Sequence, residues 1–81
     1  MPNFENLKLY HTQSCPYCQR VLRYMGENGI VLTMCDTSEP HHREDLVRVG
    51  GKSQVPCLFI DEDPLYESLD IIAYLQGLQD S

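Results

Sequence analysis

Long apolar runs and an excess of positive charge are both missing from this sequence of 81 residues. No stretch approaches the roughly 20 apolar residues that a membrane-spanning helix needs, so a helical membrane protein is excluded. The 6 Lys and Arg residues are outnumbered by 12 Asp and Glu residues, which gives a formal net charge of −6. We therefore expect neither nucleic acid nor an anionic membrane surface as a partner.

A targeting segment is also missing from the start of the sequence. Residues 1–6 have neither a basic flank nor an apolar run, so we expect no signal peptide and a cytoplasmic protein. Cysteine is sparse, with four residues at Cys15, Cys18, Cys35 and Cys57. In a reducing compartment the closely spaced pair is redox-active or metal-binding rather than structural. We expect Cys35 and Cys57 to be small buried residues.

Repeats, linkers and low-complexity segments are absent too, so residues 1–81 are expected to form a single domain. Hydrophobic patterns and turn residues predict strands at 7–10, 30–34, 55–60 and 65–66, and helices at 16–28, 41–49 and from 68 onward. The second helix should bury Leu46, Val47 and Val49, and the third Leu69, Ile72, Ala73, Leu75 and Leu78. The order β-α-β-α-β-β-α predicts an α/β fold, in which a four-stranded mixed sheet lies between helices in three α/β/α layers.

The strongest chemical motif is Cys15-Pro16-Tyr17-Cys18, at the junction of the first predicted strand and helix. Unpaired N–H groups and the macrodipole place partial positive charge at a helix start. We therefore expect the pKa of Cys15 to lie below that of a free thiol, which makes its thiolate the nucleophile in disulfide exchange. Cys18 lies one turn further and can close a ring with Cys15, resolving a mixed disulfide.

Half of a zinc site is the alternative interpretation of this cysteine pair. Such a site generally needs a second cysteine pair at similar spacing, or two histidines. Cys35 and Cys57 are far apart in the sequence, and His41 and His42 are adjacent rather than spaced as ligands. Pro16 also favours a helix start over a zinc loop. We therefore favour redox chemistry and expect no metal.

Two other segments carry weaker signals. Pro56 cannot donate a hydrogen bond to a strand ladder, so by itself it indicates an edge or a bend. Ser68 is a candidate N-cap of the last helix, with Glu67 and Asp70 beside it. Taken alone, this second pattern is ordinary for the start of a helix.

Cys15-Pro16-Tyr17-Cys18, Gln54-Val55-Pro56 and the order of elements together resemble the glutaredoxin branch of the thioredoxin superfamily. The resemblance covers nearly the whole chain and implies a thioredoxin-like fold, a cis bond before Pro56 and a dithiol that glutathione reduces. It also implies that the backbone of Val55 pairs with the cysteinyl part of glutathione. Where common glutaredoxins have two glycines, this chain has Tyr66-Glu67. Glu67-Ser68 and segment 49–56 are instead similar to a glutaredoxin subclass whose N-terminal domain resembles that of glutathione transferases.

This resemblance implies a set of contacts for each end of glutathione. The Ser68 hydroxyl and the helix start would hold the γ-glutamyl carboxylate, Glu67 or Asp70 its ammonium group, and Lys52 the glycyl carboxylate. The implied glutathione-binding residues are Tyr17, Lys52, Gln54, Val55, Pro56, Glu67, Ser68 and Asp70. Two departures from the family are visible. No lysine precedes Cys15 closely, and the all-helical second domain of the subclass does not follow within these 81 residues.

The expected activity is that of a monomeric, glutathione-dependent thiol–disulfide oxidoreductase. Its expected partners are glutathione, as reductant, and glutathionylated or disulfide-bonded proteins. Three alternatives stay open: a thioredoxin-like protein served by a flavin reductase, an iron–sulfur cluster carrier, and the glutathione-binding domain of a larger transferase.

Overall fold

A computed structural model of the chain describes residues 6–80. Residues 1–5, in which no signal peptide was expected, lie outside the described residues. The order of elements is confirmed as β1 (Leu7–His11), α1 (Pro16–Glu27), β2 (Thr33–Asp36), α2 (Pro40–Gly50), β3 (Cys57–Ile60), β4 (Asp63–Leu65) and α3 (Ser68–Asp80). Among the described residues, no helix is both long enough and apolar enough to cross a membrane.

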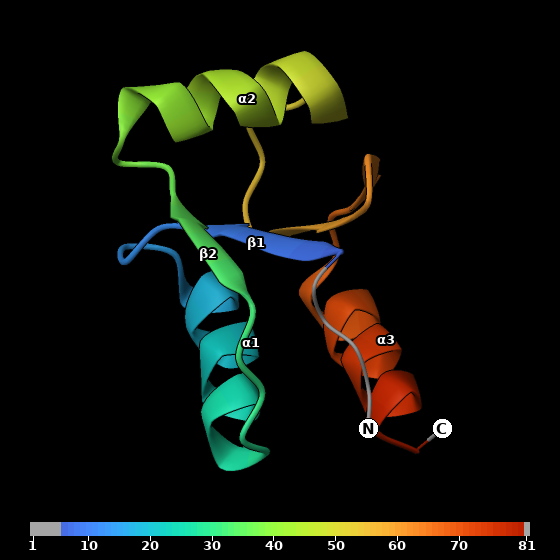
Figure 1. The fold of residues 1–81 in the computed structure, drawn as a ribbon. Coiled ribbons are helices and arrows are strands. Elements are labelled where there is room, and N and C mark those ends of the chain that lie inside the picture. Colours follow the sequence, from blue (N-terminus) through green and yellow to red (C-terminus); the bar gives the residue numbers. More distant parts are fainter. Residues whose placement is uncertain (1–5, 81) are drawn as a thin grey trace.

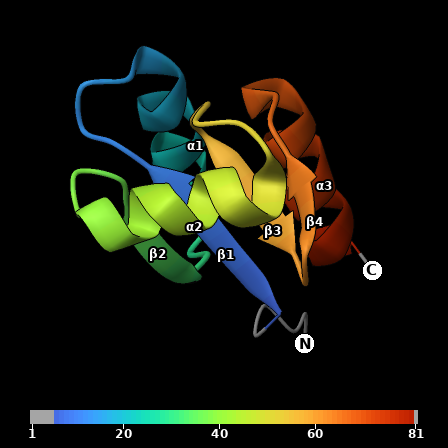
Figure 2. The same cartoon turned by 90° about the horizontal axis from the view of Figure 1, so that it is seen from above.

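The four strands form one mixed sheet in the order β2-β1-β3-β4. Helix α1 connects β1 to β2, and these two strands run parallel. The pairs β1–β3 and β3–β4 are antiparallel. Helix α2 covers one face of the sheet while α1 and α3 cover the other, and α2 lies across the strands when the sheet is seen from above (Figures 1 and 2). The predicted three-layer, thioredoxin-like architecture is therefore confirmed.

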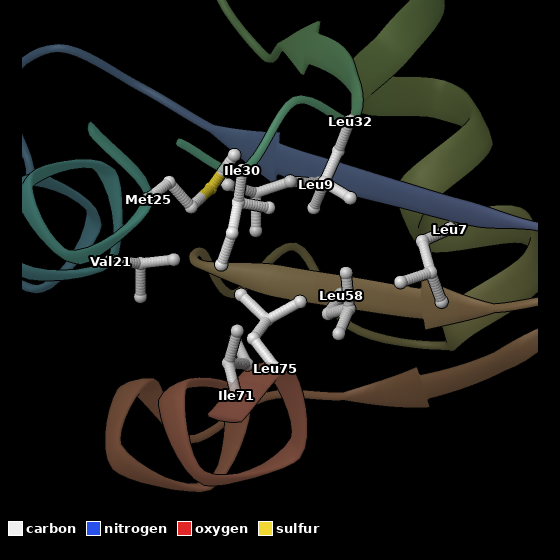
Figure 3. Close-up of a cluster of buried hydrophobic side chains, with 9 residues drawn as sticks. All are labelled: Leu7, Leu9, Val21, Met25, Ile30, Leu32, Leu58, Ile71 and Leu75. Carbon is white, nitrogen blue, oxygen red and sulfur yellow. The ribbon is translucent and has the colours of Figure 1, made fainter. Parts of the chain in front are cut away.

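Alternation along the central strands divides the core between the two faces of the sheet, because successive side chains of a strand point to opposite sides. The larger cluster lies on the side of α1 and α3 and consists of Leu7, Leu9, Val21, Met25, Ile30, Leu32, Leu58, Ile71 and Leu75 (Figure 3). The smaller cluster, under α2, consists of Tyr10, Cys35, Leu46, Cys57 and Phe59. Cys35 and Cys57 are thus buried, as expected.

The second strand begins later than the apolar segment 30–34 predicted. Ile30 and Leu32 are buried, whereas Val31 between them is 82% exposed. The alternation of burial is therefore real, but pairing with β1 starts only at Thr33, which lies opposite Lys8. The apolar residues at 30–32 therefore indicate side chains that are buried before the strand begins, and they do not mark residues paired in the sheet.

The hairpin of β3 and β4 is tighter than predicted. β3 begins at Cys57 rather than at residue 55, since Pro56 has no N–H to donate. Asp61 adopts a positive φ of 59°, which aspartate tolerates better than most residues. The turn therefore closes early, and Asp63 and Pro64 already belong to β4. Pro64 is acceptable there because β4 is an edge strand.

Helix α2 buries fewer residues than its pattern predicted. Leu46 is fully buried, but Val47 and Val49 are 45% and 39% exposed. The smaller core cluster receives a single buried residue from this helix. The expectation that all three residues face inward was wrong for the two valines.

The inward face of helix α3 only partly matches the predicted one: the burial of Leu75 is confirmed, whereas Leu69 and Ala73 were wrong and Ile71 was missed. Ile71 and Leu75, one helical turn apart, are fully buried, whereas Leu69 is 64% exposed and Ala73 is exposed. The apolar residues of this helix occupy more than one face, so periodicity alone could not choose the register. Ile72 and Leu78 pack at the margin of the larger cluster.

Leu75 and Leu69 provide a matched test of the inward face of α3. Leu75→Ala removes a fully buried side chain, so we expect the free energy of unfolding to fall by about 2–5 kcal/mol. Leu69→Ala, at an exposed position, should change it by about 0.5 kcal/mol or less. Chemical denaturation of the two variants measures the difference, and equal losses would contradict this assignment.

Candidate active site

Cys15 occupies the N-cap position of α1, at the end of the loop that follows β1. Its backbone is extended (φ −97°, ψ 117°) and Pro16 takes the first helical position, where its missing N–H is not needed. The carbonyl of Cys15 accepts the first helical hydrogen bond, from the N–H of Gln19 at 3.1 Å. The sulfur of this partly exposed residue therefore sits at the positive end of the α1 dipole.

Cys18 lies one turn further along α1 and is fully buried. Burial raises the pKa of its thiol to about 12; the neighbouring Cys15 acts in the same direction, and a backbone hydrogen bond involving Thr12 opposes both. All four cysteines are free thiols. The two cysteines of the motif are thus unequal: Cys15 is accessible, whereas Cys18 is shielded and keeps its proton near neutral pH.

Val55 and Pro56 face Cys15 from the loop before β3. The bond between them is cis, as the glutaredoxin resemblance implied. The sulfur of Cys15 lies 3.7 Å from the carbonyl oxygen of Val55, within reach of an S–H···O hydrogen bond. Only the protonated thiol can donate this bond. Ionisation of Cys15 therefore leaves the Val55 carbonyl free to accept a hydrogen bond from another molecule.

A groove of about 490 Å³ adjoins this contact. The start of α1, the loop before β3 and the start of α3 meet at one end of the sheet to form it (Figure 2). Its lining includes all but Lys52 of the residues predicted to bind glutathione: Tyr17, Gln54, Val55, Pro56, Glu67, Ser68 and Asp70. The fold therefore gathers three segments that are far apart in the sequence around one ligand-sized space.

Two predicted residues differ from expectation in their placement. Lys52 is exposed and does not line the groove, but its Nζ atom lies 5.4 Å from the ring centroid of Tyr66, which does. Ser68 is the first residue of α3 and not its N-cap, because the carbonyl of Glu67 accepts the hydrogen bond from the N–H of Ile71 at 2.9 Å. Ser68 still lines the groove, beside the unpaired N–H groups of the first turn.

Arg20 and Tyr66 also line the groove, although neither was among the predicted site residues. From the sequence, Arg20 could add positive charge near Cys15, but its direction was left open. The guanidinium carbon of Arg20 lies 5.8 Å from the ring centroid of Tyr17. Their spacing of three residues on a helix was a usable signal, because such residues share a face. Nothing in the sequence indicated that Tyr66 turns toward the groove. Among the described side chains of residues 6–79 the one ion pair is Arg48–Asp45, so none of their carboxylates pairs with Arg20.

Comparison with known proteins decides the family. Residues 9–81, nearly the whole chain, match the family described as "Glutathione S-transferase, N-terminal domain". The chain belongs to this family. Its fold is thioredoxin-like, and its Cys-Pro-Tyr-Cys motif is similar to that of the glutaredoxins.

Individual relatives of this glutathione transferase-type domain agree. Glutaredoxin 3 of Escherichia coli (strain K12) is 28% identical over 57 residues, which cover 69% of each chain. Glutathione transferase Omega 3C from Trametes versicolor has a TM-score of 0.80 and 23% identity over 95% of this chain and 35% of its own. Rice GST1, solved in complex with glutathione, has a TM-score of 0.72 and 25% identity over 93% of this chain and 34% of its own. The glutaredoxin relatives indicate a thiol–disulfide oxidoreductase.

The different burial of the four thiols predicts which one an alkylating reagent modifies. In the native protein near neutral pH, we expect iodoacetamide to modify Cys15 first, because Cys18 and Cys57 are fully buried and Cys35 is 5% exposed. Cys15→Ser should therefore label slowly, whereas all four thiols of the unfolded wild-type protein should label at similar rates. Peptide mass spectrometry resolves the sites. Labelling of native Cys18 as fast as Cys15 would contradict the burial described above.

Proposed function

We propose that this domain is a glutathione-dependent thiol–disulfide oxidoreductase that reduces protein–glutathione mixed disulfides. The observation that carries the proposal is the position of Cys15, 3.7 Å from the Val55 carbonyl and beside a groove that the predicted glutathione-binding residues line. The relationship to glutaredoxins and to a transferase solved with glutathione supports it.

The charges around the groove suit a tripeptide that carries both signs. The first turn of α3 and the Ser68 hydroxyl would receive the γ-glutamyl carboxylate, since N–H groups at a helix start bind anions. Glu67 or Asp70 would pair with the ammonium group. Lys52 would attract the glycyl carboxylate from the opposite end. In this arrangement the cysteinyl N–H of glutathione donates to the Val55 carbonyl, so its sulfur is directed toward Cys15.

The proposed reaction is two successive thiol–disulfide exchanges. The Cys15 thiolate attacks the glutathione sulfur of the mixed disulfide; an S–S bond to glutathione forms, and the substrate cysteine leaves as a thiolate that takes up a proton. A second glutathione, having lost its thiol proton, attacks the same glutathione sulfur. Glutathione disulfide leaves and the Cys15 thiolate is regenerated. Overall, one mixed disulfide and one glutathione give one protein thiol and one glutathione disulfide.

Cys18 has a separate proposed role, in the reduction of protein disulfides. There Cys15 becomes joined to a substrate cysteine, and Cys18 attacks Cys15 to form an internal disulfide and release the substrate. Two glutathiones then reduce that disulfide. Since attack requires a thiolate, the high pKa and full burial of Cys18 make this step slow. We therefore propose that the route through Cys15 alone predominates.

A second candidate is a glutathione-binding domain that serves a larger transferase. It is favoured by the family match and by the transferases of known structure, of which this chain spans about a third. The two candidates share the groove but differ in chemistry, because conjugation joins glutathione to an electrophile and needs no exchange at Cys15. Turnover of an aryl halide without turnover of a mixed disulfide would favour the second candidate.

The reductant is tested by supplying the protein with a small glutathione mixed disulfide and NADPH. One arm contains glutathione and glutathione reductase, and the other contains a flavin-dependent thioredoxin reductase. We expect NADPH consumption in the first arm only. Turnover in the second arm alone would instead identify a thioredoxin-like protein, and a brown purified protein with visible absorbance would point to an iron–sulfur carrier.

Serine variants of the motif separate the two cysteines. We expect Cys15→Ser to abolish glutathione-linked turnover, because it removes the nucleophile. Cys18→Ser should retain most of the turnover with a glutathione mixed disulfide but lose reduction of a protein disulfide. Steady-state rates with both substrates measure this, and circular dichroism checks that each variant is folded. Equal loss in the two variants would rule out the route through Cys15 alone.

A further inference from the structure

Tyr66 connects two walls of the groove that are distant in the sequence. Its ring lines the groove immediately before Glu67 and Ser68, the proposed γ-glutamyl contacts. Its hydroxyl group donates a hydrogen bond of 2.7 Å to the carbonyl of Gly50, the last residue of α2. The C-terminal end of α2 lies over β3 and β4, which brings the two segments together (Figure 2).

The Gly50 end of this hydrogen bond has no room for a side chain. A Cβ atom at Gly50 would lie 2.6 Å from the Tyr66 oxygen and 3.3 Å from the Phe59 ring. The next residue, Gly51, has a φ of 87°, and this left-handed conformation turns the chain away from the helix toward Lys52. Tyr66 therefore holds the loop at the point where it leaves α2.

The exposed Lys52 side chain lies beside the ring of the same tyrosine. Its ammonium nitrogen lies 5.4 Å from the centroid of the Tyr66 ring, a cation–π distance. Burial raises the pKa of Tyr66, and a backbone hydrogen bond involving Lys52 partly opposes that shift. The tyrosine thus contacts both the backbone and the side chain of the loop that carries the proposed glycyl-carboxylate ligand.

We propose that Tyr66 is a positioning residue for glutathione, which holds Lys52 at a fixed distance from the γ-glutamyl site at the start of α3. This inference rests on the proposed function. The hydroxyl bond to Gly50 and the ring contact with Lys52 set the spacing between the two ends of the groove. Tyr66 thereby selects a ligand that carries carboxylates at both ends, and it acts through Lys52 rather than on the reacting sulfur.

The test compares glutathione with its glycyl ethyl ester, in which the carboxylate proposed to meet Lys52 is neutralised. Tyr66→Phe keeps the ring and removes the hydroxyl group. With glutathione we expect its KM to rise about threefold to tenfold while kcat changes less than twofold, because a binding contact is weakened and the chemistry is not. With the ester, Tyr66→Phe and the wild type should have the same KM.

Two further variants make the test independent of a single substitution. Lys52→Met should raise the KM for glutathione and leave that for the ester unchanged, and Tyr66→Phe added to it should have little further effect. Gly50→Ala should reproduce Tyr66→Phe, since a Cβ atom there displaces the hydroxyl group. Tyr24→Phe is the matched control, because it loses a hydroxyl bond of 2.8 Å to Gln79, outside the groove lining. It should leave both KM values unchanged.

The outcomes separate this inference from the function on which it rests. Wild-type protein that fails to use glutathione refutes the proposed function and the inference with it. If the wild type is active, an unchanged KM in Tyr66→Phe, equal rises for glutathione and its ester, or a loss confined to kcat each overturns the positioning role alone. Additive effects of the Lys52 and Tyr66 substitutions on the KM for glutathione would also overturn the positioning role.

Discussion

Antiparallel pairing of β1 with β3 is the constraint on which the whole site depends. Because Tyr10 lies opposite Cys57, the loop leading out of β1 and the loop leading into β3 emerge at the same end of the sheet. β4 returns beside β3 with Leu65 opposite Leu58, so the segment that begins α3 starts from that end too. Two helix N-termini and a proline loop therefore converge. A shift of one residue in this register would turn the buried side chains of the strand outward, and it would separate the segments that meet at the site.

The meeting of these loops gives the Cys15 sulfur and the proposed ligand a common hydrogen-bond acceptor. The Val55 carbonyl accepts from the Cys15 thiol in the free protein, at 3.7 Å. The same carbonyl is the one proposed to accept from the backbone of glutathione. A ligand that takes this acceptor would displace the hydrogen bond that the Cys15 thiol donates. Fully buried Cys18 has no such exchange of partners, and its desolvation keeps it protonated.

The sequence predicted the parts of this molecule that are set by local chemistry. The helix start at Pro16, the order of elements and most of the groove lining followed from turn residues, periodicity and a family resemblance. Features that depend on how helices and strands pack against one another could not be predicted from the sequence. The exposure of Leu69 and the full burial of Ile71 depend on the rotation of α3 against the sheet, and no periodicity distinguished them. Tyr66 was overlooked for the same reason, since its partner Gly50 lies sixteen residues away on another element.

The location of charge around the groove bears on how an acidic protein would hold the anionic tripeptide proposed above. The net charge of −6 is spread over the whole chain, and at physiological ionic strength charges further apart than about 8 Å are largely screened. Groups in contact with a ligand are not screened to that extent. The first turn of α3 and the ammonium group of Lys52 would act at contact distance, and Arg20 adds a guanidinium group on the α1 side. In the proposed complex these groups would meet the carboxylates of the ligand, while Glu67 and Asp70, which also line the groove, would meet its ammonium group. The acidic surface disfavours anions that cannot reach into the groove, so the charge distribution that would accept glutathione opposes nonspecific binding of larger polyanions.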